Sequence, residues 1–592
     1  MNRAPFPKVI DVDLMLVFPP FQRLVVSMEN IGIAYIAASA RSAGFTAAMI
    51  NAGLHGLDAD DVAALLDRSR FRVLGISTLH WTMPAAVAIA RAARASHPEA
   101  HIIFGGIEAA LDAERILHAC PFVDSVGLGE GERTVVALLA KLAAGADWRA
   151  VEGLAFRDGD GVRYSPPARL IEPLDDLPFP TRDDMAAVQD GGGAASMSSS
   201  RGCPGRCTFC SVRAFYGRSE GPSWRGRSPR SVVTEMQELQ ERHGTRLFAF
   251  IDETVVGPGE QGAKRLRELA VRIQDAGLAC QFFMTVRADQ VEHSLFQELR
   301  AAGLRKVEIG IESMSPSQLK RYGKIADVAD NRRALRILEE LGIAVELFMV
   351  PFDPGLTPRE LAENLAFYRE RYQGQAGYDV SPLSMGNYLY PYPGTETRRI
   401  YARNGWLAED GGQAQARCRA RDPRMQRVGE MMNRLTGAVE PAFPMSYLGL
   451  GNLWVNGASL PAPVYERIGA MCAEIGALLV SVAEWAVGAT GRPLPVPIGD
   501  VAGYICDLRR YLAEFGRLQD ELRRIVDACR ADGAEPHVST EGVSAPTAFA
   551  TALYALGRAR KRRFMEEIKV RELDAYDIIT DMVNILTGEA VS

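Results

Sequence analysis

The sequence has no long apolar run and no strong excess of charge of either sign. Charged residues make up 24% of the 592 residues and the formal net charge is -6, which gives no reason to expect a nucleic-acid backbone as partner. The most apolar window, residues 475–489, contains Glu484 and is shorter than a membrane span. The first residues lack the basic head, apolar stretch and cleavage site of a signal peptide. We therefore expect a cytoplasmic protein that binds neither nucleic acid nor membrane.

The nine cysteines lack the pattern of a disulfide framework, because their number is odd and most of them are scattered. The exception is the group Cys203, Cys207 and Cys210, which falls within eight positions. A structural zinc site needs four ligands, and no second Cys-x-x-Cys pair accompanies these three, so zinc is disfavoured. Three thiolates on one short loop suit a [4Fe-4S] cluster in which one iron has no protein ligand and is open to a substrate or cofactor.

Residues 1–150 alternate apolar strand-like runs with helical patterns, and each strand and helix pair has the length of a βαβ unit. This alternation predicts a doubly wound parallel sheet of Rossmann type, whose ligands bind beyond the carboxyl ends of the strands. Residues 151–192 are rich in Pro, Asp and Gly and have no sustained periodicity, which predicts a linker between domains.

Residues 193–400 contain a second series, in which six predicted strands are separated by helical segments. Six such units in order predict a partial (β/α)6 barrel of the TIM type, with its chemistry at the carboxyl ends of the strands. The three cysteines follow the first predicted strand, and the sixth covers residues 378–390. Beyond these units only amphipathic helices are predicted, so residues 401–592 are expected to form a helical C-terminal region. The predicted fold class is therefore α/β followed by helices.

The spacing Cys-x3-Cys-x2-Cys, with Phe209 before the last cysteine and the loop after the first barrel strand, resembles the radical S-adenosylmethionine (SAM) superfamily. The resemblance implies that the three cysteines bind a [4Fe-4S] cluster whose open iron chelates SAM, and that an electron from the cluster cleaves SAM to a 5'-deoxyadenosyl radical. It also implies that Phe209 contacts adenine. Residues at the ends of the second, third and fourth barrel strands match SAM-binding positions of the family: Asp252, Glu253, Thr254, Arg287, Glu312 and Ser313.

The first domain resembles the cobalamin-binding domain that precedes the barrel in class B radical SAM methylases, through segments such as "FPP", "FGGIEA" and "GLGEGE". Cobalamin proteins that ligate cobalt with histidine carry Asp-x-His-x-x-Gly, but here Gly53 stands two positions before His55, so His55 is not expected to bind cobalt. His80 or Trp81 is then the candidate for the lower cobalt face, with a surface His and a packed Trp as the alternative. The resemblance places the cofactor on the following strand-end residues: Gly75, Ser77, Thr78, Gly105, Gly106, Gly129 and Glu130.

Together the two resemblances imply methylation of an unactivated carbon in a natural product or peptide, with methylcobalamin giving its methyl group to a substrate radical. An external electron donor such as flavodoxin or ferredoxin is also implied. Asp353, Tyr388 and Tyr390 are the candidates for catalysis at the barrel mouth, and packing of the barrel rim is the alternative for the tyrosines.

Three other functions stay open. A cobalamin-dependent enzyme of the same superfamily can rearrange, contract or cyclise its substrate rather than methylate it. The first domain can also be a scaffold that has lost cobalamin, which leaves a radical SAM oxidoreductase or carbon-sulfur bond former. The last alternative is a cobalamin sensor without chemistry, which the cysteine loop argues against because a sensor needs no radical initiator.

Overall fold

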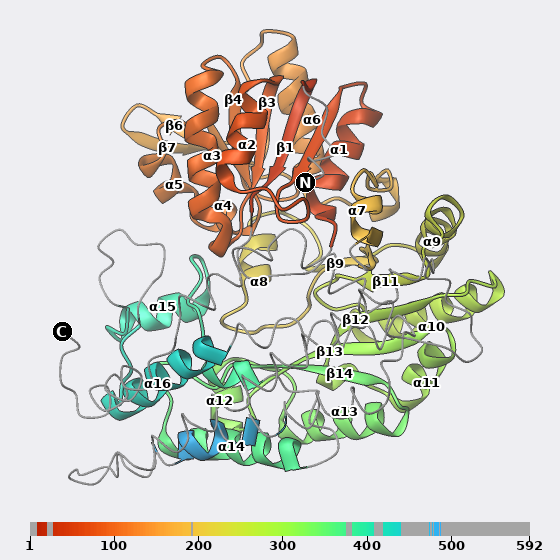
Figure 1. Cartoon of the computed structure of the whole chain (residues 1–592), viewed down its shortest axis with the longest axis vertical. Helices are drawn as coiled ribbons and strands as arrows, with labels where there is room; N and C mark the ends of the chain where they lie inside the picture. Colours follow the sequence, from red (N-terminus) through yellow and green to blue (C-terminus); the bar gives the residue numbers. More distant parts are fainter. Residues whose placement is uncertain are drawn as a thin grey trace, which may run out of the picture. The chain divides into compact units, whose positions relative to one another are not determined.

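The structure is a computed structural model of the whole chain. It describes residues 9–20, 28–190, 193–373, 382–407 and 418–439, with some helical positions between 473 and 486 (Figure 1). The described residues fall into two compact units. The first unit is built from the chain up to Arg206, from Cys210–Cys280 and from Tyr392–Arg398; the second is built from Cys207–Phe209, Gln281–Pro391 and the chain from Arg399 onward.

The first unit contains a seven-stranded sheet in which five parallel strands are extended at one edge by two antiparallel strands. The spatial order is β2-β1-β3-β4-β5-β6-β7, so the strand order reverses between β1 and β3, and ligands of such sheets bind at that switch point. The strands are β1 (Asp11–Phe18), β2 (Ala47–Asn51), β3 (Arg70–Ser77), β4 (His101–Gly105), β5 (Ser125–Gly127), β6 (Leu154–Asp158) and β7 (Gly161–Tyr164).

Helices cover both faces of this sheet, because successive side chains of each buried strand point to opposite faces and both sets are apolar. In β1, Leu14 and Leu16 pack into a core with α1 and α6, whereas Met15 and Val17 pack into a core with α2, α3 and α5. The predicted doubly wound sheet is therefore confirmed. The helices are α1 (Ile31–Ser42), α2 (Ala59–Asp67), α3 (Met83–Ser96), α4 (Ile107–Leu111), α5 (Ala113–Ala119) and α6 (Gly131–Ala143).

The segment predicted as a linker, residues 151–192, is partly ordered secondary structure that completes the first sheet. Strand β6 pairs antiparallel with β5, and β7 pairs antiparallel with β6. Ala155 and Phe156 are buried, and Gly159 takes the positive φ of 60° that the tight turn between the strands requires. The sequence pattern missed the hairpin because these strands are short and most of β7 is polar. A short helix, α7 (Met185–Asp190), follows.

The remainder of the first unit begins the second series of strands and helices. Strands β8 and β11 pair in parallel, and β9 and β10 pair antiparallel beside them. The elements are β8 (Ala195–Met197), β9 (Ser200–Gly202), α8 (Ser211–Tyr216), β10 (Trp224–Gly226), α9 (Pro229–His243), β11 (Leu247–Phe250) and α10 (Gly259–Asp275).

The second unit continues the series with three parallel strands in the order β12-β13-β14. The register between β13 and β14 shifts between Gly310 and Glu312, which marks an irregularity at the carboxyl end of β13. The elements are β12 (Gln281–Arg287), α11 (His293–Ala301), β13 (Leu304–Glu312), α12 (Pro316–Arg321), α13 (Val328–Glu340), β14 (Ala344–Met349) and α14 (Pro358–Gln373).

The predicted sixth strand is not a strand where it is described. Pro382–Gly386 form a 3-10 helix, and only an isolated bridge between Phe352 and Tyr388 follows. Proline has no N–H to donate to a ladder, which disfavours strand pairing at this position. Of the predicted helical region, α15 (Glu396–Arg403) and α16 (Pro423–Val439) are described, and most of the rest lies outside the described residues. No helix in the described part of the chain is long and apolar enough to cross a membrane.

Candidate functional site

The cysteine loop lies between β9 and α8, and its three thiols are all half-buried. Gly202 opens the loop with a φ of 84°, and a Cβ there would lie 2.1 Å from the Ser223 carbonyl oxygen. Only glycine satisfies both conditions. Next in the loop, the Gly205 N–H donates to Cys203 Sγ at 3.3 Å. Cys210 then begins α8 as its N-cap residue.

The donor set of this loop fits an iron-sulfur cluster better than a single metal ion. Among the residues that the structure describes, no three His, Cys, Asp or Glu side chains converge to hold one ion. A [4Fe-4S] cluster makes no such demand, because each cysteine binds a different iron. Three half-buried thiols, one of them with a peptide N–H on its sulfur, therefore match the cluster that the spacing predicted.

A buried carboxylate fixes the turn that leads into the loop. Asp252, which follows β11, is 3% exposed and accepts hydrogen bonds from the backbone N–H and hydroxyl groups of Ser199 and Ser200. Burial raises the pKa of Asp252. Both carboxylate oxygens therefore hold the Ser199–Ser200 turn, and contact of Asp252 with the SAM amino group stays a prediction.

The two residues after Asp252 also support this turn. Glu253 accepts a hydrogen bond from the Gly202 N–H at 3.0 Å through Oε2, and burial raises the pKa of Glu253. Thr254 is fully buried, and its carbonyl oxygen accepts from Ser200 Oγ at 3.2 Å and from Trp224 Nε1 at 3.1 Å. Contact of Glu253 and Thr254 with SAM stays a prediction.

In the second unit, the residues predicted to bind SAM are Arg287, Glu312 and Ser313. Arg287 forms an ion pair with Asp289, with Nε 3.0 Å from Oδ1. Ser313 is fully buried, and its hydroxyl contacts Gln318 at 2.7 Å and Asn364 at 2.9 Å. These buried partners give the Ser313 hydroxyl a structural role, and its predicted SAM contact stays a prediction.

Glu312 has the most unusual backbone of the predicted residues. Its φ is 60°, the only positive value for a non-glycine residue in the described part of the chain. A left-handed conformation costs roughly 1–2 kcal/mol, and such strain is concentrated at functional sites. The carboxylate lies 3.5 Å from Lys324 Nζ, and the Glu312 carbonyl oxygen accepts the Val350 N–H at 2.8 Å. Glu312 therefore stays a candidate for SAM binding.

At the carboxyl edge of the first sheet, small residues bring the ends of β3 and β4 together. Thr78 is buried and bonds through its hydroxyl to the Gly105 carbonyl oxygen at 2.9 Å, and it accepts the Ala109 N–H at 3.0 Å. Gly106 has a φ of 88°, and a Cβ there would lie 2.6 Å from the Thr78 carbonyl oxygen and 3.3 Å from Ser77 Oγ. By contrast, open space surrounds Gly105, where a Cβ would meet nothing within 4 Å.

Three other residues predicted to bind cobalamin have structural explanations. A Cβ at Gly75, inside β3, would lie 2.8 Å from Leu16 Cδ2, so this glycine serves strand packing. Glu130 accepts hydrogen bonds from Arg201 at 2.9 Å, Arg225 at 2.8 Å and the Ile171 N–H at 2.7 Å, so its carboxylate is occupied by protein groups. A Cβ at Gly129 would lie 3.0 Å from Ser219 Oγ. For these three positions the structure shows packing or ion pairing, and the predicted cofactor contact stays a prediction.

A buried carboxylate that the sequence analysis missed lies at the same edge. Glu108, in α4, is 3% exposed, and its Oε1 lies 3.5 Å from His80 Nδ1. Its Oε2 has no hydrogen-bond partner among the described residues. A buried oxygen of this kind is rare unless an ion, water or ligand supplies the partner, so this edge fits a bound polar group such as a cobalamin side chain. The signal available in the sequence was its place two positions after Gly106.

The histidines and Trp81 near this edge have distinct surroundings. The His80 ring meets Tyr392 edge to face, with centroids 6.3 Å apart, whereas Trp81 is 49% exposed. His55 Nε2 lies 2.9 Å from Asp184 Oδ1 in a buried pair, and its expected lack of cobalt ligation stays a prediction. Which residue faces the lower side of cobalt stays a prediction.

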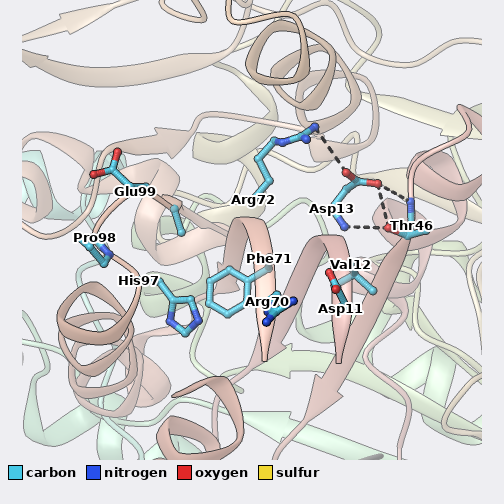
Figure 2. A pocket seen from close by; sticks show the side chains of 11 residues that line it. Asp11, Val12, Asp13, Thr46, Arg70, Phe71, Arg72, His97, Pro98 and Glu99 are labelled. Carbon is cyan, nitrogen blue, oxygen red and sulfur yellow. Dashed lines mark hydrogen bonds and ion pairs between the residues drawn. The ribbon is translucent and has the colours of Figure 1, made fainter. Parts of the chain in front are cut away.

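A second feature of the first domain is a cleft at the amino ends of β1, β3 and β4, opposite the edge just described. It has a volume of about 490 Å³ and is lined by groups of both charges, among them Asp13, Arg72 and Glu99 (Figure 2). His97 stacks on Phe71 there, with centroids 4.4 Å apart, and its Nε2 lies 2.8 Å from the Ser69 carbonyl oxygen. His97 and His101 have a His-x-x-x-His spacing, but His101 Nε2 contacts Ser125 Oγ at 2.8 Å. The two rings therefore contact different partners. Among the described residues, no group of three His, Cys, Asp or Glu side chains that could hold a metal ion includes them.

The three candidates for catalysis have different surroundings. Asp353 is 3% exposed, and both of its oxygens bond to neighbouring side chains, so its role in catalysis stays a prediction. Tyr388 stacks on Phe352 with centroids 5.4 Å apart and donates to the Gln426 carbonyl oxygen at 3.3 Å, which favours packing. Tyr390 is half-buried, and its role stays a prediction.

A charged network that sequence analysis missed precedes the cysteine loop. Arg201 pairs with Glu130 at 2.9 Å and with Glu132 at 2.6 Å, and Arg225 pairs with Glu130 at 2.8 Å. The nearby carboxylates raise the pKa of Arg201 although burial opposes the charge. No local pattern predicts this network, because Arg201 and Glu130 are 71 positions apart. It joins the end of the first sheet to the strand that enters the loop.

Two family descriptions match the chain. The B12 binding domain matches residues 23–139, and the radical SAM superfamily matches residues 197–368. The three cysteines lie near the start of the second match, as the spacing predicted.

Curated relatives cover both domains. An uncharacterized methyltransferase of Pyrococcus horikoshii is 26% identical over 403 residues, which are 67% of this chain and 84% of that protein. The anaerobic magnesium-protoporphyrin IX monomethyl ester cyclase of Rubrivivax gelatinosus is 26% identical over 325 residues, which are 53% of this chain and 57% of that protein.

Two solved structures have a similar fold. The cobalamin-dependent S-adenosylmethionine radical enzyme OxsB, with aqua-cobalamin and S-adenosylmethionine bound, aligns with a TM-score of 0.65 at 16% identity and covers 98% of this chain and 84% of its own. The radical S-adenosylmethionine methyltransferase TsrM from Kitasatospora setae, with cobalamin and a [4Fe-4S] cluster bound, aligns with a TM-score of 0.56 at 17% identity over 69% of this chain and 77% of its own. At these identities the likeness establishes the fold.

Proposed function

We propose that this chain, which belongs to the cobalamin-dependent radical SAM enzymes, methylates an unactivated carbon of a small molecule or peptide. The observation that carries the proposal is the joint presence, in one chain, of a B12 binding domain and a three-thiol loop inside a radical SAM domain. The methyltransferases among its relatives and structural neighbours support methyl transfer as the outcome.

The residues present fit all three cofactors of this chemistry. Cys203, Cys207 and Cys210 would hold the cluster, and Glu253 and Glu312 are the carboxylates that we propose for SAM binding. The edge formed by Ser77, Gly105 and Glu108 would hold cobalamin. When bound, the cluster and SAM supply a radical that abstracts hydrogen, and cobalamin supplies the methyl group.

The chain's own contribution is binding, orientation and the exclusion of water. Asp252 and Glu253 fix the backbone at the start of the cysteine loop through the Ser199, Ser200 and Gly202 N–H groups. Thr78 and Gly106 fix the ends of β3 and β4 against each other. Both loops are therefore set by buried hydrogen bonds before any ligand arrives, which lowers the ordering cost of binding.

The proposal includes an external one-electron donor, such as a flavodoxin or a ferredoxin. The cluster must be reduced before SAM is cleaved, and the remaining six cysteines are scattered without a second cluster motif in the sequence. A separate protein would therefore deliver the electron.

Rearrangement or ring formation is the second candidate function. It is favoured by the likeness to the anaerobic magnesium-protoporphyrin IX monomethyl ester cyclase of Rubrivivax gelatinosus. The two candidates differ in whether the methyl group of SAM leaves SAM, so the fate of that group distinguishes them.

Anaerobic reconstitution of the full chain tests the cluster assignment first. We expect about four irons and four sulfides per chain, as one cluster requires. Changing Cys203, Cys207 or Cys210 to Ala should abolish SAM cleavage to 5'-deoxyadenosine, whereas Cys280→Ala, outside the loop, should leave it unchanged. Cleavage at the parent rate in any of the three loop variants would contradict the assignment.

A further inference from the structure

The end of α12 holds the middle of the cysteine loop. The Thr208 N–H donates to the Tyr322 carbonyl oxygen at 2.8 Å, and the Thr208 hydroxyl donates to the Arg321 carbonyl oxygen at 3.3 Å. The Phe209 ring meets the Tyr322 ring edge to face, with centroids 5.6 Å apart. Thr208 and Phe209 are the two residues between Cys207 and Cys210, so these contacts fix the spacer between two cluster ligands.

Hydrogen bonds of its hydroxyl group in turn fix the Tyr322 side chain. The side chain is 1% exposed, and its oxygen lies 3.0 Å from the Val350 carbonyl oxygen and 3.2 Å from Asp353 Oδ2. Gln318 Nε2 donates to the same hydroxyl at 2.9 Å. A buried phenol with this many partners has one rotamer available, which holds the ring that contacts Phe209.

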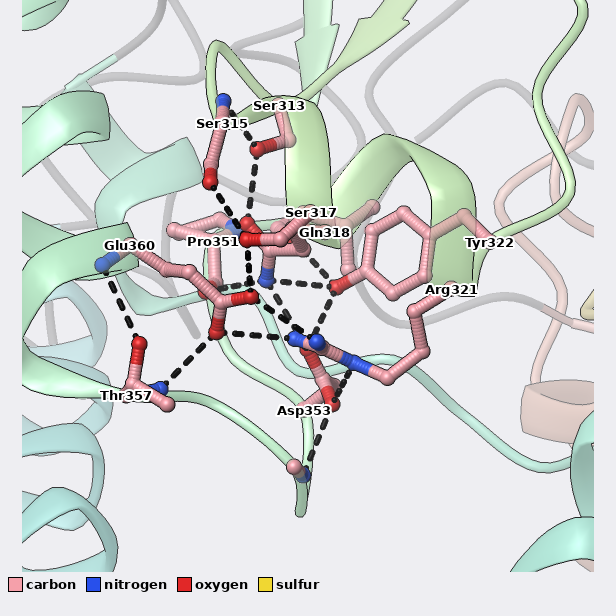
Figure 3. Close-up of polar contacts among 12 residues, drawn as sticks. Ser313, Ser315, Ser317, Gln318, Arg321, Tyr322, Pro351, Asp353, Thr357 and Glu360 are labelled. Carbon is pink, nitrogen blue, oxygen red and sulfur yellow. Dashed lines mark hydrogen bonds and ion pairs between the residues drawn. The ribbon is translucent and has the colours of Figure 1, made fainter.

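Arg321 anchors the same turn with its guanidinium group, which reaches both Asp353 and Glu360 (Figure 3). Its Nε and one terminal nitrogen contact Asp353 at 3.0 and 2.7 Å, and the terminal nitrogens contact Glu360 at 2.9 and 3.1 Å. Both carboxylates are 3% exposed. The Gly355 and Thr357 N–H groups complete their hydrogen bonds at 2.8 and 2.9 Å.

Positioning explains these charged contacts better than stability does. A buried ion pair gives little net stability compared with apolar packing, but it holds its partners in one geometry. Here the geometry that is held is that of Arg321 and Tyr322, whose carbonyl oxygens are the acceptors for Thr208. The network therefore fixes the two carbonyl oxygens that hold the cysteine loop at Thr208.

We propose that Gln318, Arg321, Tyr322, Asp353 and Glu360 form a clasp that positions the segment between Cys207 and Cys210 for cluster binding. These are positioning residues, and Asp353 belongs to them rather than to the catalytic groups. The inference rests on the proposed function in one respect, the assignment of the three cysteines to a cluster. It adds that cluster retention and the geometry at the cluster depend on a network outside the cysteine motif.

Two variants remove hydroxyl hydrogen bonds of this network with little change in side-chain shape. Thr208→Val removes the hydroxyl bond to Arg321, and Tyr322→Phe keeps the ring against Phe209 but removes its hydroxyl partners. Arg332→Gln is the matched control, because Arg332 forms a two-bond ion pair with Glu370 in the same unit, at 2.9 and 3.0 Å, on an exposed surface. All three are made in the full chain and reconstituted anaerobically.

The readouts are iron release to a ferrous chelator and the paramagnetic-resonance spectrum of the reduced cluster with and without SAM. Loss of one net hydrogen bond is worth about 1 kcal/mol, so Thr208→Val should release iron about fivefold faster than the parent protein. Tyr322→Phe loses three hydroxyl contacts and should release iron at least as fast as Thr208→Val. Their spectra should broaden and respond less to SAM, whereas Arg332→Gln should match the parent in both readouts. The thermal unfolding midpoint is measured alongside, because a role in stability alone would lower it without altering the spectrum.

The outcomes separate the clasp from the cluster assignment. A parent protein that binds no cluster would contradict the assignment and the clasp with it. A parent with a full cluster, together with parent-like iron release and spectra in both clasp variants, would contradict the clasp alone. If Tyr322→Phe fails to fold, Thr208→Val decides, because it changes one half-buried hydroxyl on the loop itself.

Discussion

At the scale of single residues, burial and partners decide which polar side chains are available to ligands. Asp252, Ser313 and Asp353 all stand at strand ends where the family places functional groups, yet each is nearly or fully buried and bonded to protein groups. Glu108 has the opposite character, since its buried Oε2 has no partner in the described part of the chain. All four residues are polar and follow a strand in the sequence, so residue type and position do not distinguish them. Only their contacts in the structure do.

The orphaned oxygen of Glu108 leads to a prediction about cobalamin. A hydrogen bond to a charged group is worth about 1.5–3 kcal/mol, so Glu108→Gln should weaken cobalamin binding by roughly tenfold or more. Glu99→Gln is the control, because Glu99 is exposed in the cleft at the opposite edge of the same sheet. Equilibrium dialysis measures both, and iron content confirms that the cluster is unaffected. Equal affinity in Glu108→Gln and the parent protein would remove Glu108 from the cofactor site.

At the scale of elements, the loops that carry the site depend on backbone conformations that few residues adopt. Gly202 enters the cysteine loop with a φ of 84°, and Glu312 ends β13 with a φ of 60°. Strand β13 also loses its register with β14 at this point. The strained positions therefore lie at the carboxyl ends of strands, where the chemistry is expected.

Gly202 permits a test that separates backbone strain from steric exclusion. A Cβ at Gly202 would lie 2.1 Å from the Ser223 carbonyl oxygen, whereas a Cβ at Gly244, where φ is 65°, would meet nothing within 4 Å. Gly244→Ala should cost about 1–2 kcal/mol of stability and keep a full cluster. Gly202→Ala should have the same cost of backbone strain. In addition it should displace β9 from β10, so that the iron content falls. Full iron content in Gly202→Ala would show that the entry to the loop does not depend on this close approach.

The elements also show how far sequence alone reaches. The doubly wound sheet could be predicted because both faces of β1 are apolar, and the cluster loop because three thiols have a specific spacing. The hairpin of β6 and β7 was missed because it is short and half polar, and the sixth strand was wrong where it is described because Pro382 begins a 3-10 helix. The clasp could not be predicted, since Arg321 and Asp353 are 32 positions apart and no local pattern pairs them.

At the scale of the whole molecule, the chain joins two cofactor-binding domains through buried charge. Within the first compact unit, Arg201 stands two positions before Cys203 and pairs with Glu130 and Glu132, which follow the last parallel strand of the first sheet. Breaking such a pair on one side typically costs 3–5 kcal/mol, because a buried charge is left alone. The edge of the B12 binding domain and the entry to the cysteine loop are therefore held in one arrangement by this network.

The central claim is that methyl transfer through cobalamin, started by a radical SAM cluster, is the work of this chain. The most direct measurement uses SAM with an isotopically labelled methyl group and the reconstituted, cobalamin-loaded protein under reducing conditions, without any need to know the substrate. The account predicts that the label is recovered on the protein-bound corrinoid and that Cys207→Ala still binds cobalamin but yields no 5'-deoxyadenosine. Formation of 5'-deoxyadenosine with no label on the corrinoid would contradict methyl transfer and favour rearrangement or ring formation.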